Sequence, residues 1–203
     1  EDAMSIHSTV RQAIHAHPLR SSLLLSYGRR ALNDGFISEA MDVIEQVESI
    51  LPDSALVQYR KAMILDRAGK TSEAIEALHR GILLTDNVSS YLQEARNAAY
   101  DASAVLREAI AQQQLVITPT QIQPKLDLIE TYLSVQKTTE ATALAQSIYG
   151  STDMARAETV ISIFEQTHAL EALPTEYLTN QSSVAYDATA RMEYAQKHWS
   201  AAT

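Results

Sequence analysis

The sequence contains no cysteine among its 203 residues and only five glycines. Without thiols the chain has no disulfides, no thiolate nucleophile and no cysteine-based zinc site, and both oxidising and reducing compartments suit it. Few glycines leave little material for ligand-binding loops, and no Gly-x-Ser-x-Gly element, phosphate loop or dinucleotide fingerprint occurs. The sequence therefore predicts no enzyme activity and implies no cofactor.

Positive charge and long apolar runs are also scarce. The 16 Lys and Arg residues are outnumbered by 25 Asp and Glu residues, which gives a formal net charge of −9. Nucleic-acid-binding proteins usually concentrate Lys and Arg on one face, so nucleic acid is not expected as a partner. Apolar runs, such as residues 23–25 and 82–84, are far shorter than the ~20 residues that span a bilayer, so no transmembrane segment is expected.

Apolar material is nevertheless plentiful, at 46% of the residues. This is enough for a buried core, so one domain or one continuous repeat array is expected. The sequence begins with Glu1 rather than Met and lacks a basic segment followed by an apolar one. This beginning predicts a processed or excised piece of a longer protein.

A period of 34 residues is the main signal in the sequence, because residues 31–40 recur as residues 65–74. Four residue types keep their places in both copies: Gly35 and Gly69, Ser38 and Ser72, Glu39 and Glu73, Ala40 and Ala74. Glycine lets the chain reverse after one helix, serine can cap the next, and alanine lets two helices approach closely. The period predicts a helix–turn–helix unit.

Apolar residues around this segment recur at helical spacing, so both helices of each unit are expected to bury one face. Only Glu48 interrupts the apolar stripe of the helix that follows Gly35. One set of acidic residues is interpreted as the solvated face of that helix rather than as an acid/base pair: Glu39, Asp42, Glu45 and Glu48. Pro18 lies 34 residues before Pro52, so residues 2–17 are interpreted as the second helix of a repeat that lacks its first.

These units resemble the tetratricopeptide repeat, whose pattern alternates small residues with large apolar ones and often ends in proline. The copy that begins at Ser21 matches with Leu24, Tyr27, Gly28, Ala40, Ile44 and Pro52. The copy that begins at Ala55 matches with Ala62, Leu65, Ala74, Leu78 and Gly81. It departs from the pattern at Gln58 and Lys61, where large apolar residues are usual, and at Asp86, where proline is usual.

The resemblance implies an all-α fold, a right-handed superhelical solenoid of antiparallel helix pairs in a single domain over residues 1–203. The expected parts are a terminal half repeat or cap (2–17), two clear repeats (19–53 and 55–88), two degenerate repeats (89–121 and 122–155) and irregular C-terminal helices (156–203). Residues 98–114 read as an almost unbroken helix, so a tight bend or irregular geometry is expected in the third repeat.

In this family the first helix of each pair lines a concave surface that binds peptides. The resemblance implies partner-binding residues at Arg29, Asn33, Tyr59, Met63, Arg67, Tyr91 and Glu94, with Leu25, Asp66 and Asp101 at further inward positions. It therefore predicts a protein–protein interaction scaffold for a peptide or protein partner. A chaperone-tail adaptor is disfavoured, because Leu25 and Arg29 stand where its carboxylate clamp needs Lys and Asn.

Alternative hypotheses remain open. Such arrays also occur in bacterial envelope export or polysaccharide-secretion assemblies, and a periplasmic or a cytoplasmic location suits this chain equally. A further alternative is an accessory or catalytic domain that uses C-terminal residues: Tyr186, Tyr194, His198 and Trp199. Three N-terminal histidines are interpreted as solvated rather than metal-binding: His7, His15 and His17. Exposed terminal helices would allow self-association.

Overall fold

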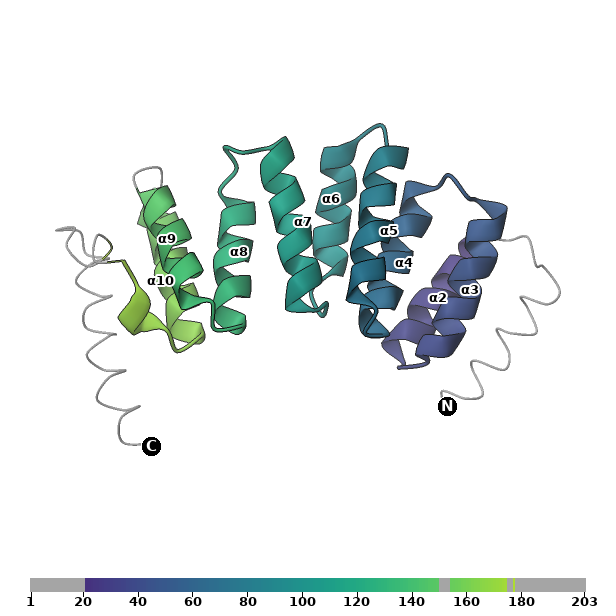
Figure 1. The fold of residues 1–203 in the computed structure, drawn as a ribbon, viewed down its shortest axis with the longest axis horizontal. Coiled ribbons are helices and arrows are strands. Elements are labelled where there is room, and N and C mark those ends of the chain that lie inside the picture. The colour runs from purple at the N-terminus through teal and green to yellow at the C-terminus, as the bar shows by residue number, and fades with distance from the viewer. Residues whose placement is uncertain (1–20, 150–153, 175–176, 178–203) are drawn as a thin grey trace. The chain divides into compact units, whose positions relative to one another are not determined.

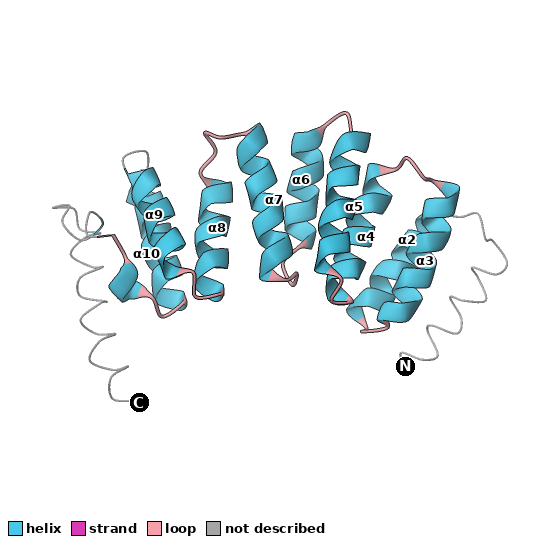
Figure 2. Cartoon of the chain, viewed as in Figure 1, coloured by secondary structure: helices cyan, strands magenta, loops and turns pink. Residues whose placement is uncertain are grey.

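The computed structural model describes residues 21–149, 154–174 and 177, and all regular structure in these ranges is helical (Figures 1 and 2). The all-α prediction is confirmed for this part of the chain, whereas the superhelical arrangement stays a prediction. No helix in these ranges is long and apolar enough to cross a membrane. Several predictions lie outside the described residues: the half repeat at 2–17 with its histidines, and the C-terminal residues Tyr186, Tyr194, His198 and Trp199.

The chain divides into two compact units, residues 1–113 and 114–203, where the sequence predicts one continuous domain. The described helices of the first unit are α2 (Ser21–Asn33), α3 (Ile37–Ile50), α4 (Ala55–Arg67), α5 (Thr71–Leu84) and α6 (Val88–Ala98). Helix α7 (Ala104–Ile117) contains the boundary. The second unit holds α8 (Gln123–Ser134), α9 (Thr138–Ile148), α10 (Met154–Gln166) and a short 3₁₀ helix (Leu170–Ala172).

Glycine makes the turn between the two helices of each clear repeat. Gly35 and Gly69 have positive φ angles of 84° and 76°, a conformation that favours glycine. Each turn is closed by a backbone hydrogen bond between residues five apart. In the first repeat, Phe36 N–H donates to the Ala31 carbonyl at 2.8 Å. This is the Schellman type of helix end, and it confirms the predicted role of both glycines.

The repeated serines do not cap the second helices, so that prediction was wrong. Ser38 and Ser72 are each the second residue of their helix, and the N-cap positions belong to Phe36 and Lys70. Neither N-cap makes a side-chain hydrogen bond, because phenylalanine and lysine have no side-chain acceptor for a backbone N–H. The serines are left exposed in the first turn.

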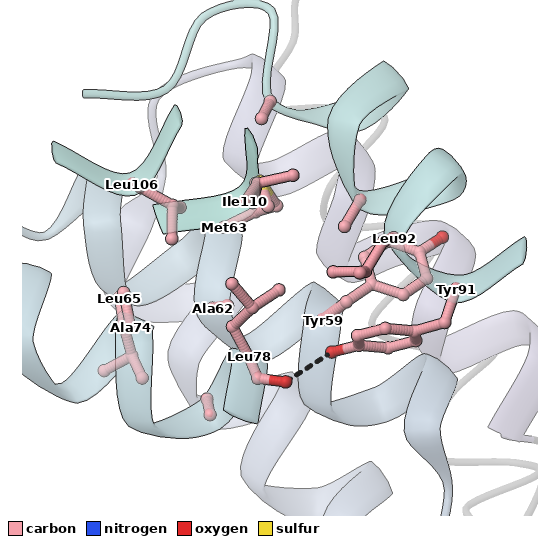
Figure 3. Packing of buried hydrophobic residues seen from close by; sticks show 13 residues of the cluster. Tyr59, Ala62, Met63, Leu65, Ala74, Leu78, Tyr91, Leu92, Leu106 and Ile110 are labelled. Atoms are coloured by element: carbon pink, nitrogen blue, oxygen red, sulfur yellow. Dashed lines mark hydrogen bonds between the residues drawn. The ribbon is translucent and has the colours of Figure 1, made fainter. Parts of the chain in front are cut away.

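Small residues occupy the closest helix contacts, as the period predicts. Ala40 and Ala74 are fully buried, and a Cβ added at Gly28 would lie 3.3 Å from Cγ1 of Val43. Two buried clusters fill the first unit. One lies around α2, α3 and α4, and the other, shown in Figure 3, extends from α4 to α7. The second unit has its own cluster, which runs from Leu126 to Tyr177.

Glu48 is not on a solvated face, which corrects the interpretation made from the sequence. Its side chain is 19% exposed, and its carboxylate accepts hydrogen bonds from Gln58 Nε2 at 3.0 Å and Lys61 Nζ at 2.7 Å. Arg80 Nη1 lies 3.7 Å away. The polar residues that depart from the repeat pattern on α3 and α4 therefore satisfy one another, while Asp42 and Glu45 are exposed as expected.

Burial tends to raise the pKa of Glu48, but the hydrogen bonds from Lys61 and Gln58 and the charges of Lys61 and Arg80 lower the pKa below its ordinary value. Glu48 is thus held as a carboxylate that joins three helices, α3, α4 and α5.

In the third repeat the chain bends at residues 99–103, between α6 and α7. The near-unbroken helix over residues 98–114 was therefore a wrong prediction, and the tight bend was a correct one. Ser103 caps α7 by accepting from Leu106 N–H at 3.2 Å. Its own N–H and hydroxyl donate to the Asp66 carboxylate at 2.7 and 2.5 Å. Asp66, predicted to face inward toward a partner, is instead buried and fixes the start of α7.

Candidate functional site

A groove with a volume of about 450 Å³ lies over the first helices of three successive pairs, α2, α4 and α6. It lies wholly within the first unit. Its lining residues are Arg29, Leu32, Asn33, Tyr59, Arg60, Met63, Arg67, Glu94, Asn97, Ala98, Asp101 and Ala102.

The structure brings most of the predicted partner-binding residues to this one groove. Those that line it are Arg29, Asn33, Tyr59, Met63, Arg67 and Glu94, together with the inward residue Asp101. Tyr91, Leu25 and Asp66 do not line it.

Helical spacing explains why these residues converge. Tyr59, Met63 and Arg67 follow one another four residues apart on α4, so they form a stripe along one face of that helix. Arg29 and Asn33 have the same spacing on α2. Because α4 packs against both α2 and α6, the stripes of three helices lie side by side.

The floor of the groove is aromatic and apolar. Tyr59 and Met63 are 5% and 7% exposed, so each presents only a small surface to the groove. The Tyr59 ring meets the Tyr91 ring edge to face, with centroids 6.1 Å apart, and the Arg60 guanidinium lies 4.9 Å from the Tyr59 centroid. Burial raises the pKa of Tyr59, which keeps the phenol neutral.

The rim of the groove is charged. Arg67 Nη2 lies 3.3 Å from Asp101 Oδ2, and both side chains are largely exposed, so this pair adds little stability. Glu94 is exposed on the same side. Among the described residues, no carboxylate lies within ion-pair distance of Arg29 or Arg60.

Tyr91 is a packing residue, which corrects its place among the partner-binding residues. It is 5% exposed, and its hydroxyl donates to the Leu78 carbonyl at 3.1 Å (Figure 3). A Cβ at Gly81 would overlap that hydroxyl and lie 2.8 Å from the ring Cε2. Burial, with a smaller contribution from Tyr59, raises the pKa of Tyr91. The ring therefore holds α6 against α5 from beneath the groove.

A second hollow of about 20 Å³ adjoins the groove between α2, α3 and α4. It shares Arg29, Leu32, Arg60 and Met63 with the groove. Its other lining residues are apolar: Leu24, Leu25, Gly28, Val43, Ile44 and Ile64. This space accommodates one methyl-sized group.

The sequence did not indicate Arg60 or Asn97 as groove residues. Arg60 follows Tyr59 directly, so helical spacing directs it to a different face. Its long side chain returns to the groove by lying over the ring of its neighbour Tyr59, a side-chain conformation that helical spacing does not give. Asn97 lies three residues after Glu94, and this spacing could have found it.

Within the described ranges, no three or more His, Asp or Glu residues form a group that could hold a metal ion. Compared with known proteins, the chain matches no family model and no curated protein.

Proposed function

We propose that this chain is a protein-interaction module that binds a peptide segment of another protein in the groove over α2, α4 and α6. One observation carries the proposal: six of the residues that the repeat pattern marks as partner-binding line a single groove. A buried aromatic and methionine floor with an exposed charged rim suits peptide recognition, since aromatic and arginine side chains contribute much of the energy at protein interfaces.

The chemistry of the groove supports binding rather than catalysis. Its lining includes no Ser, Thr or His that could serve as a nucleophile or a base. Burial raises the pKa of Tyr59 above its ordinary value, and the carboxylates of Glu94 and Asp101 are exposed to solvent. The described residues add no observation in favour of an envelope-export assembly or an accessory catalytic domain.

Affinity capture with matched variants tests the proposal. The groove variant combines Arg29→Ala, Asn33→Ala and Glu94→Ala, all exposed residues whose loss should leave the core intact. The control combines Lys70→Ala, Ser72→Ala and Glu76→Ala, which also removes one cation, one neutral polar group and one anion from exposed positions outside the groove. Tyr91 is left unchanged because its loss would disturb the core.

The wild-type chain and the control are expected to retain the same protein from a lysate of the source cell, and the groove variant is expected to lose it. Circular dichroism should show equal helicity and melting temperature for all three chains. Equal retention by the groove variant would contradict the proposal and would place any binding surface elsewhere.

A further inference from the structure

We infer that the groove selects an acidic peptide segment and seats a carboxylate of that segment between Arg29 and Arg60. This inference rests on the proposed function and names the chemistry of the partner. The carboxylate is directed to the α2 side of the groove, where the two arginines line both the groove and the adjoining hollow.

Within the described part of the chain, two arginines of the groove have no carboxylate to neutralise them. Arg30, Arg67 and Arg80 each have a carboxylate within 4 Å, at 2.6, 3.3 and 3.7 Å respectively. Arg29 and Arg60 have no such partner among the described residues, although the chain carries nine excess negative charges. These two guanidinium groups lie on adjacent helices and line one hollow. Together they can bind an anion such as a carboxylate.

The charges of the groove also fix the direction of the peptide. Glu94 and Asp101 lie on the α6 side, and Asp101 already pairs with Arg67. A second acidic residue placed there would be repelled, whereas a neutral or basic residue would not. The α2 side adds Asn33, one turn after Arg29, whose amide can donate to the same carboxylate. The preferred segment is therefore acidic at one end only.

The adjoining hollow narrows the class of peptide further. It lies beside Arg29 and Arg60, and its remaining walls are apolar except for the Gly28 backbone. A volume of about 20 Å³ takes one methyl-sized group, so a small aliphatic side chain next to the acidic residue fits. A large aromatic side chain would not enter without displacing the buried core around Leu24 and Ile44.

The test begins with a displayed library of random peptides of about 12 residues, long enough to cross three packed helices. The library is selected on the full 203-residue chain, and enriched peptides are measured by fluorescence anisotropy. Enriched sequences are expected to contain Asp or Glu next to Ala or Val. Replacing that acidic residue by its amide should weaken binding by roughly tenfold, as for the loss of one charge-assisted hydrogen-bonded pair.

Arginine variants supply the matched comparison. Arg29→Gln and Arg60→Gln should each weaken binding of the acidic peptide by about tenfold. Arg30→Gln changes the neighbouring arginine on α2, which does not line the groove, and should have no effect. The double variant Arg29→Glu with Arg60→Glu should instead bind a peptide in which Lys replaces the acidic residue. Equal binding by Arg29→Gln, Arg60→Gln and Arg30→Gln would overturn the inference.

The same selection separates this inference from the proposed function. Neutral or basic peptides that bind the wild-type chain but not the Arg29, Asn33 and Glu94 triple alanine variant would overturn the acidic preference and leave the groove as the binding site. Enrichment of peptides that the triple variant binds equally well, or no enrichment at all, would overturn both.

Discussion

At the scale of single residues, Tyr91 and Gly81 form a matched pair beneath the groove. The hydroxyl of Tyr91 reaches the Leu78 carbonyl only because residue 81 has no side chain. The Tyr91 ring also meets the Tyr59 ring edge to face. Tyr91, which does not line the groove, can therefore set the position of Tyr59, which does.

Gly81→Ala is expected to destabilise the first unit although alanine is the better helix former by about 1 kcal/mol. The new Cβ would overlap the Tyr91 ring, and overpacking a buried contact costs roughly 1–3 kcal/mol. Urea unfolding of the single and double variants measures the coupling. In a Tyr91→Leu background, which removes the hydroxyl, the same Gly81→Ala change should cost less or become stabilising. An equal cost in both backgrounds would show that the two residues do not act together.

At the scale of helices, Glu48 joins α3, α4 and α5 through a partly buried carboxylate. The folded state lowers the pKa of Glu48 below its ordinary value of 4.5. A carboxyl group with a lowered pKa stabilises the fold above its unfolded pKa, and that contribution is lost as the pH falls through the folded pKa. Its loss is therefore confined to acid, below about pH 4.5.

Glu48→Gln should lower the free energy of unfolding at pH 7 by about 1–2 kcal/mol, because the hydrogen bonds lose their charge. The difference between wild type and variant should shrink as the pH falls below 4.5. Urea unfolding across a pH series measures both effects. Glu45→Gln, an exposed change on the same helix, is the control and should alter neither. A difference that stays constant down to strong acid would rule out the carboxylate as the cause.

At the scale of the whole molecule, each compact unit has buried clusters of its own, two in the first unit and one in the second. Phe164 is fully buried in the second unit, and Leu78 is fully buried in the first. Since no described cluster draws residues from both units, we expect damage to one core to act mainly on its own unit.

Phe164→Ala is expected to cost about 3–5 kcal/mol and Leu78→Ala about 2–5 kcal/mol, because each leaves a cavity. Hydrogen exchange followed by mass spectrometry locates the effect. Phe164→Ala should speed exchange in α8, α9 and α10 and leave α4 and α5 protected, with the reverse pattern for Leu78→Ala. Uniform loss of protection in either variant would mean that the chain unfolds as one cooperative body.

The sequence predicted best those parts that local geometry dictates. A positive φ angle requires a residue such as Gly35, and a close helix contact requires one such as Ala40, so a 34-residue period fixes both turns and the inward stripes that line the groove. Features that depend on distant partners could not be predicted. Asp66 meets Ser103 across 37 residues, and no local pattern distinguishes its carboxylate from a solvated one.

The positions of the Tyr91 and Arg60 side chains were not predicted either, for a different reason. The repeat pattern gives the side of the helix on which a residue lies, but it does not give the depth to which a long side chain sinks or the direction in which it folds back. Tyr91 sinks onto Leu78, and Arg60 folds back over Tyr59. Seven residues that line the candidate groove were therefore predictable as inward-facing, while the depth of the groove and its balance of charges were not.

The bond between Glu48 and its donors also bears on how such a chain can be altered. Restoring the repeat consensus with a leucine at position 58, while Glu48 remains, would leave a half-buried carboxylate short of one donor. Replacing Glu48 alone by an apolar residue would leave the Gln58 amide, whose residue is 1% exposed, without its acceptor. Glu48, Gln58 and Lys61 are therefore not independent positions for mutation. Related chains that keep a glutamate at position 48 are expected to keep hydrogen-bond donors at positions 58 and 61 as well.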